Sequence, residues 1–157
     1  MLQRATPTIR ELLSYRLHQV ANLLSRGAEM RYRREFGVSL WEWRTIALLG
    51  ASAEPHSLGH LARAAGIDKG QMSRVVTGLA RRRIVLRAAH PADGRGVRLT
   101  LSKLGVRIYQ GLIRAAAERD AAFRGCLSKA EHQVFDRALA KLAGRAHEFI
   151  RREKVTK

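Results

Sequence analysis

The amino-acid sequence predicts a mainly α-helical fold with one small β-hairpin. Apolar residues recur at helical spacing along most of the 157-residue chain, and Ser-x-x-Glu helix-start signals occur at Ser39 and Ser128. Only Val97–Leu101 alternates strictly between apolar and polar side chains, as a strand does. With 46% hydrophobic residues, the chain can bury a core, so we expect one folded domain over residues 1–157 rather than disorder.

The first helix is predicted to begin after Thr8. A second helix opens at the capping box Ser39–Glu42, in which the serine hydroxyl meets one free amide and Glu42 reaches back to another. It continues to about Gly50 and is apolar on most sides, so we expect it to be buried. The apolar face of the first helix is formed by Ile9, Leu12, Leu13, Leu17, Val20 and Leu24.

Two short helices joined by a glycine turn follow. Ser57 can cap the first and Asp68 the second, Gly66 can supply a left-handed turn residue, and Ala62 is small where the helices would cross. With Ile67 at the corner, this spacing is typical of a helix–turn–helix, although an ordinary helical hairpin is the alternative. The second helix has an inner face of Met72, Val75, Val76 and Leu79 and an outer face of Lys69, Gln71, Ser73, Arg74, Thr77 and Arg81.

A β-hairpin is predicted after these helices. Its strands are Ile84–Leu86 and Val97–Leu101, and the Asp93–Gly94 turn lies between them. The hairpin projects arginines, which makes it a basic appendage of the helix–turn–helix: Arg87, Arg95 and Arg98.

Two long helices complete the chain. Ser102 can cap the first, and the capping box Ser128–Glu131 opens the last. The apolar stripe of the last helix, from Val134 to Ile150, is too long for the small central lobe to cover. We therefore expect a homodimer, the alternative being a terminal helix folded onto its own core.

The charge is strongly positive and unevenly distributed. The net charge is +17, and residues 57–101 carry nine basic side chains against two acidic ones, Asp68 and Asp93. Such a stretch repels itself unless a partner neutralises it, and nucleic-acid phosphates do so by counterion release. Double-stranded DNA is thus the expected partner, with Gln71, Ser73 and Arg74 as base readers and Lys69 and Thr77 on phosphates. A merely basic, soluble surface is the other interpretation.

Several other classes of protein are not favoured. The single cysteine, Cys126, excludes an intrachain disulfide framework, and no motif marks it as an activated thiol. The six histidines are dispersed, so we expect no metal site and no cofactor, and no catalytic arrangement indicates an enzyme. With no apolar run long enough to cross a bilayer and no signal-peptide pattern, we expect a cytoplasmic protein that does not contact membranes.

Three segments carry a resemblance to a known family. Trp43–Leu49, Leu58–Arg83 and Asp93–Gly105 resemble the second helix, the helix–turn–helix and the wing of the MarR (multiple antibiotic resistance regulator) family of winged helix–turn–helix transcription factors. The resemblance implies a homodimer with dimerisation helices at 8–36 and 102–153 around a DNA-binding lobe at 39–101. It also implies that Arg95 enters the minor groove and that Asp93 orients the wing.

Two residues depart from the family pattern. Arg83 stands where relatives often have glycine, at the end of the recognition helix. Gly70 lies near the start of that helix, which it weakens by roughly 0.5–1 kcal/mol relative to alanine. It either permits a close approach to the DNA backbone or is neutral.

The resemblance also implies a repressor that a small aromatic carboxylate or phenol releases from DNA. A cationic or imidazole side chain beside aromatic rings suits such an effector, although each candidate can equally be a core or surface residue. Broad-specificity DNA organisation or anti-silencing without an effector is the alternative function, and a module whose DNA role is vestigial is another. The sequence identifies neither the operator nor the regulated genes. The candidate pocket residues are Tyr15, Arg16, His18, Trp43, Arg44 and Tyr109.

Overall fold

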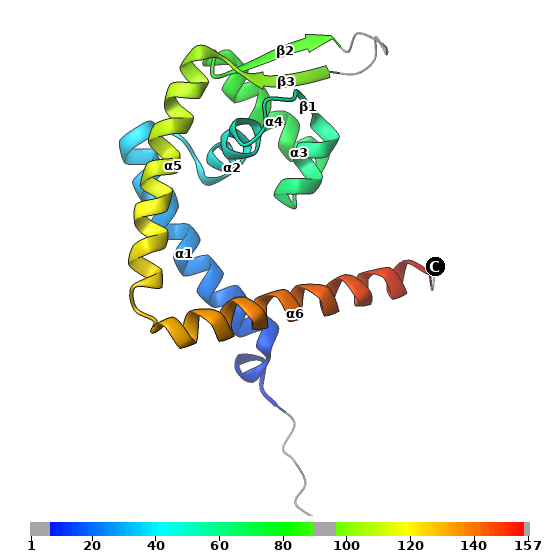
Figure 1. Cartoon of the computed structure of the whole chain (residues 1–157). Helices are drawn as coiled ribbons and strands as arrows, with labels where there is room; N and C mark the ends of the chain where they lie inside the picture. The colour runs from blue at the N-terminus through cyan, green and yellow to red at the C-terminus, as the bar shows by residue number, and fades with distance from the viewer. Residues whose placement is uncertain (1–6, 90–96, 156–157) are drawn as a thin grey trace, which may run out of the picture. The chain divides into compact units, whose positions relative to one another are not determined.

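The computed structural model describes residues 7–89 and 97–155, and it confirms the mainly α-helical fold with a small antiparallel sheet (Figure 1). The chain divides into two compact units, Met1–Arg114 and Ala115–Lys157, so the boundary falls inside a helix. The described elements are a 3₁₀ turn at Ile9–Glu11, α1 (Leu13–Phe36), α2 (Leu40–Gly50), β1 (His56–Ser57), α3 (Leu58–Ala65), α4 (Lys69–Arg81), β2 (Val85–Ala89), β3 (Val97–Leu101), α5 (Lys103–Arg124) and α6 (Lys129–Val155).

The first predicted helix is interrupted near its start. Thr8 caps only the 3₁₀ turn, because the Glu11 carboxylate accepts hydrogen bonds from the Thr8 amide (2.6 Å) and hydroxyl (3.0 Å) and closes a short box. Leu12 then adopts an extended conformation, with ψ at 132°, and α1 begins after it. The prediction of one continuous helix from Thr8 is therefore wrong at this point.

The predicted helix caps of the first unit form. Ser39 Oγ accepts from the Glu42 amide at 3.2 Å, while Glu42 Oε2 accepts from the Ser39 amide at 2.8 Å, so α2 begins at a complete capping box. Ser57 Oγ accepts from the His60 amide at 3.2 Å and starts α3. Each cap satisfies an amide that would otherwise lack an intrahelical partner.

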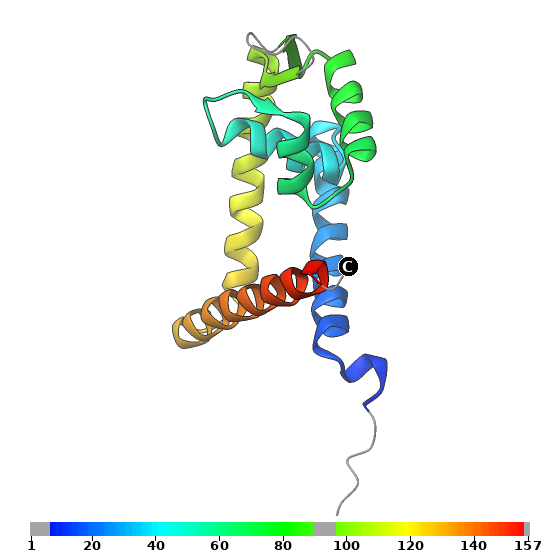
Figure 2. The same cartoon turned by 90° about the vertical axis from the view of Figure 1, so that its right-hand side faces the viewer.

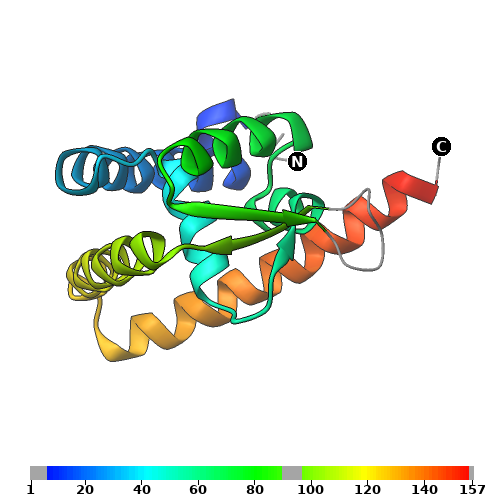
Figure 3. The same cartoon turned by 90° about the horizontal axis from the view of Figure 1, so that it is seen from above.

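The sheet has three strands rather than the two of the predicted hairpin. β3 lies in the middle, with β2 on one side and the two-residue strand β1 on the other, all antiparallel (Figure 3). β2 begins at Val85 and not at Ile84, because the Ile84 amide donates to Leu79 O and its carbonyl accepts from Ser102 N. The predicted Asp93–Gly94 turn lies outside the described residues.

The core of the first unit lies where α2 packs against α1, α3, α4 and the sheet. Its largest fully buried side chains come from six different elements, α5 included through Leu112, and burying each stabilises the fold by about 1.5–3 kcal/mol. Buried Thr45 is satisfied within α2, since its hydroxyl donates to Trp41 O at 2.8 Å. This core includes Tyr32, Ile46, Leu61, Met72, Leu79 and Leu99.

Two glycines let α5 pack closely in the first unit. A Cβ built on Gly105 would overlap the Ile84 carbonyl oxygen, and one built on Gly111 would lie 2.6 Å from the Phe36 ring. Gly105 therefore lets the start of α5 pack against Ile84, in the turn after α4, and Gly111 brings α5 against the end of α1. The sequence patterns did not reveal these contacts.

Much of α1 has no cover within the first unit, and it runs away from the lobe (Figure 2). Only Ala28 and Tyr32 of this helix are buried. In the second unit, Ser128 and Glu131 form the predicted capping box at the start of α6, and α6 has no buried residue. No described helix is both long and apolar enough to span a bilayer.

Candidate nucleic-acid interface

The turn between α3 and α4 has the geometry predicted for a helix–turn–helix. Gly66 ends α3 in the left-handed region, with φ at +71°, and its amide bonds back to Arg63 O at 3.2 Å. The Ile67 amide reaches Ala62 O at 3.1 Å, and Ala62 is buried. Asp68 then starts α4 by accepting the Gln71 amide at 2.8 Å. These bonds at both ends of the turn hold α4 at a fixed angle to α3.

The two faces of α4 differ in burial as their residue types predict. Met72, Val76 and Leu79 are buried, and Val75 is half-buried. On the outer face, Lys69, Arg74 and Arg81 are exposed, while Gln71, Ser73 and Thr77 are half-buried. All six predicted outer residues therefore have accessible surface, and their contacts with DNA remain a prediction.

Gly70 has a structural reason within the protein itself. A Cβ at this position would lie 3.1 Å from Asp68 Oδ1, the oxygen that caps α4. A larger residue would press on this carboxylate, so glycine preserves the cap at the cost of some helix propensity. Neither interpretation from the sequence included this contact.

Side-chain hydrogen bonds and one ion pair connect the end of α4 and the turn after it to neighbouring elements. Arg83 has φ at +56° and is the one non-glycine residue with positive φ in the described parts of the chain. Its carbonyl accepts a 2.6 Å hydrogen bond from Ser102 Oγ, and this serine also accepts the Gly105 amide at 3.0 Å. Arg82 forms a 3.1 Å ion pair with Glu42, which joins the end of α4 to the start of α2. Arg83 therefore occupies a left-handed conformation that glycine adopts more easily, and nothing in the structure explains why arginine stands here.

Most cations in the described part of the lobe form no ion pair. On α1, Arg31 pairs with Glu35 and Arg33 with Glu29. By contrast, Arg82 is the one lobe cation with an ion pair among the described residues, and Asp68 is engaged in capping α4. The cations without such a pair on α3, α4, the turn after α4 and the described strands are Arg63, Lys69, Arg74, Arg81, Arg83, Arg87 and Arg98. No described acidic residue pairs with these side chains, which favours the binding of an external anion.

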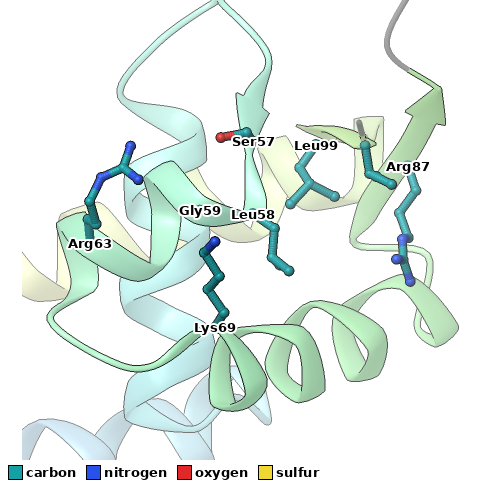
Figure 4. Close-up of a pocket in the computed structure, with 8 residues that line it drawn as sticks. Ser57, Leu58, Gly59, Arg63, Lys69, Arg87 and Leu99 are labelled. Atoms are coloured by element: carbon teal, nitrogen blue, oxygen red, sulfur yellow. The ribbon is translucent and has the colours of Figure 1, made fainter. Parts of the chain in front are cut away.

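Three of these cations surround a hollow of about 500 Å³ between α3, α4 and the sheet (Figure 4). Arg63 and Lys69 lie at the end nearest Gly59, and Arg87 lies at the opposite end, above α4. Leu58, Val97 and Leu99 also line the hollow. Arg63 was not among the predicted contact residues, because it lies on the first helix of the motif and not on the outer face of the second.

The predicted minor-groove residue Arg95 and the wing-orienting Asp93 lie outside the described residues. The strands that lead to them, β2 and β3, are described, and Arg87 is opposite Leu99 in their register. The wing assignment is therefore still a prediction that depends on the sequence.

The structure does not bring the six candidate effector residues into one pocket. Trp43 and Arg44 line a pocket of about 350 Å³ between α2 and α3. Tyr109 lines a different pocket of about 290 Å³, and its ring lies against Gly50, where a Cβ would be 2.6 Å away. The remaining three lie near the start of α1: Tyr15 is half-buried, Arg16 is exposed, and exposed His18 hydrogen-bonds Asn22 at 2.8 Å.

Two other predictions concern metals and the cysteine. Within residues 7–89 and 97–155, no group of three or more His, Cys, Asp or Glu side chains is placed to hold a metal ion. Cys126 is exposed, and its thiol donates to Phe123 O at 2.9 Å.

Known proteins resemble the chain in its lobe and in its fold. Residues 36–96 match the MarR family model. The structure is similar to a MarR/EmrR family transcriptional regulator from Acinetobacter sp. ADP1 (TM-score 0.81, 24% identity, 90% of this chain and 99% of the other). It is also similar to Staphylococcus aureus MepR in complex with DNA (0.79, 17%, 85% and 98%). A third similar structure is PcaV from Streptomyces coelicolor with its natural ligand (0.71, 22%, 90% and 99%). No curated protein matches the chain.

Proposed function

We propose, from its MarR-type fold and the MarR family match of its lobe, that this chain is a transcriptional regulator that binds double-stranded DNA as a homodimer. The observation that supports DNA binding most directly is the face of unpaired cations on α3, α4 and β2. In this proposal Gln71, Ser73 and Arg74 read base edges, Lys69 and Thr77 contact phosphates, and Arg95 reaches the minor groove. The chain would act where the DNA is, in the cytoplasm.

The homodimer is supported by apolar surface that each unit leaves uncovered. On α1, the residues Leu13, Val20 and Leu23 are 54%, 55% and 67% exposed, and α6 has no buried residue in its whole length. Apolar faces of this extent on soluble helices are typical of subunit contacts. A dimer would also place two recognition helices on a pseudo-palindromic operator, with half-sites about one helical turn apart.

We further propose that the chain is a repressor released by a small aromatic acid. The pocket beside Trp43 and Arg44 supports this idea best, because an aromatic ring and a guanidinium there suit a ring with a carboxylate. The Arg44 guanidinium is 4.7 Å from the centre of the Trp41 ring, so it already stacks on an aromatic face that an effector could extend.

The test is a fluorescence-anisotropy titration against the DNA upstream of the chain's own gene at about 150 mM salt. Unrelated DNA serves as competitor, and a panel of aromatic carboxylates is added afterwards. Binding that survives competition and is released by one compound would support an effector-controlled regulator. Failure to bind any DNA at low salt would contradict the proposal.

The net charge of +17 favours a second function, DNA organisation or anti-silencing with broad specificity. Charge-driven binding is salt-dependent and largely independent of sequence. In the same titration, binding that unrelated DNA removes and no compound alters would favour this second function over the first.

A further inference from the structure

We propose that the hollow between α3, α4 and the sheet is the seat of the DNA backbone strand that separates the major groove from the minor groove. In this seat Arg63 and Arg87 would hold phosphates together with Lys69. The inference rests on the proposed DNA-binding function. It adds two contact residues that the sequence did not assign to DNA and gives Gly59 a functional role.

The hollow lies between α4 and the strands of the sheet. If α4 occupies the major groove, the β2 and β3 strands lead toward the adjacent minor groove. One sugar–phosphate strand always lies between two adjacent grooves, so this strand must cross the space between α4 and the sheet. The hollow occupies this space, since it is lined from both sides: by Lys69 of α4 and by Arg87, Val97 and Leu99 of the strands (Figure 4).

Two cationic side chains, Arg63 and Lys69, approach Gly59. A Cβ built on Gly59 would lie 3.6 Å from Arg63 Nη1 and 3.6 Å from Lys69 Cε. The two side chains, from different helices, therefore approach one point that has no side chain of its own. Neither forms an ion pair among the described residues, so both are available to a phosphate oxygen.

Apolar side chains also line the hollow, together with the cations at its two ends. Leu58 and Leu99 lie between the Arg63–Lys69 end and Arg87, and Val97 also lines the hollow. A DNA backbone offers the matching chemistry, because anionic phosphates alternate with deoxyribose rings that present carbon atoms. A small amphipathic anion would fit one charged end and the apolar floor, but it would leave the other end unneutralised.

The test variant is Gly59→Glu. Position 59 is in the first turn of α3, where a negative charge is favourable, and Arg63 is four residues further along the helix. The new carboxylate can therefore pair with Arg63 and fill the seat without opposing the fold. Ala51→Glu, at the end of α2, is the matched control, because Ala51 is exposed and does not line the hollow, and the change in net charge is identical. Thermal unfolding and sedimentation verify that both variants fold and keep the same oligomeric state.

The readout is the slope of log affinity against log salt, together with variants Arg63→Ala and Arg87→Ala. Each alanine variant removes one phosphate contact per subunit and two per homodimer, so the slope falls by about 2. The advantage of wild type over the variant then shrinks roughly tenfold between about 50 and 200 mM salt. We expect Gly59→Glu to show at least the same loss and Ala51→Glu to bind nearly as the wild type does.

The outcomes separate this inference from the function on which it rests. If the wild type binds no DNA, the proposed function fails. If the wild type binds and Gly59→Glu matches Ala51→Glu at every salt concentration, the seat is wrong while the function stands. If the seat variants bind DNA normally but lose release by an aromatic carboxylate, the hollow is a small-molecule site, which also overturns the inference.

Discussion

Replacing Gly105 by alanine tests how closely the start of α5 packs against Ile84, in the turn that follows α4. A Cβ at this position overlaps the Ile84 carbonyl oxygen and lies 3.2 Å from its carbon and 3.3 Å from Leu101 Cβ. The Ile84 carbonyl cannot move away freely, because it accepts the Ser102 amide at 3.0 Å. The overlap is with backbone rather than with a flexible side chain, so its cost lies toward the upper end of the range of about 1–3 kcal/mol for overpacking.

The higher helix propensity of alanine offsets less than about 1 kcal/mol of this cost. We therefore expect the Gly105→Ala variant to be destabilised by about 2 kcal/mol, or to unfold about 4–8 °C lower for a chain of this size. The assay is urea and thermal unfolding followed by circular dichroism. Gly27→Ala is the control, since its Cβ meets nothing within 4 Å and it should gain about 0.5–1 kcal/mol. Equal stabilisation of both variants would refute the reasoning, because it would show that α5 does not press on Ile84.

Three further predictions concern DNA contact, backbone strain and acid stability. Arg74→Ala should weaken operator binding by about 1–3 kcal/mol, and unchanged affinity in an anisotropy titration would remove it from the base readers. Arg83→Gly should leave stability unchanged or raise it by up to about 1 kcal/mol, since it relieves a φ of +56° while making the unfolded chain more flexible; a clear loss in urea unfolding would contradict this. Hydrogen bonds from the Ser128 amide and hydroxyl lower the pKa of Glu131 from 4.5, so the α6 cap stabilises the fold above that pH and is lost as the pH falls through the lowered value. Glu131→Gln should therefore reduce the acid sensitivity of α6 measured by circular dichroism below pH 4.5, and an unchanged acid transition would argue against this cap.

The features that the sequence predicted correctly are those encoded within a few residues. Ser39 with Glu42, Ser128 with Glu131, and Asp68 each identified a helix start, because a cap is a bond between residues about three positions apart. The failure at Leu12 has the same origin. A capping box at Thr8 was compatible with a long helix or a single turn, and the apolar periodicity that continued past it favoured the wrong choice.

Features that depend on contacts between distant segments could not be predicted in this way. β1 consists of two residues, and it is a strand only because His56 pairs with Leu99, 43 positions away. Its own sequence has no alternation to detect. For the interface, the outer face of α4 followed from its periodicity, whereas the approach of Arg63 to Lys69 required the angle between α3 and α4. The candidate effector residues had neither kind of signal, and they are distributed among separate places on α1, α2 and α5.

The distribution of ion pairs separates two roles of the charge. Acidic residues on α1, α5 and α6 pair with arginines along their own helices or in the neighbouring helix of the same unit, as Glu35 does with Arg31 and Asp120 with Arg124. These pairs are exposed, so they contribute little stability and salt should change the fold only slightly. The described part of the lobe has few acidic residues, and most of its cations form no ion pair, so they are available to bind an anion. Rising salt should therefore weaken DNA binding steeply at concentrations where the urea midpoint barely moves. If both fell together, the lobe charge would be supporting the fold rather than a partner.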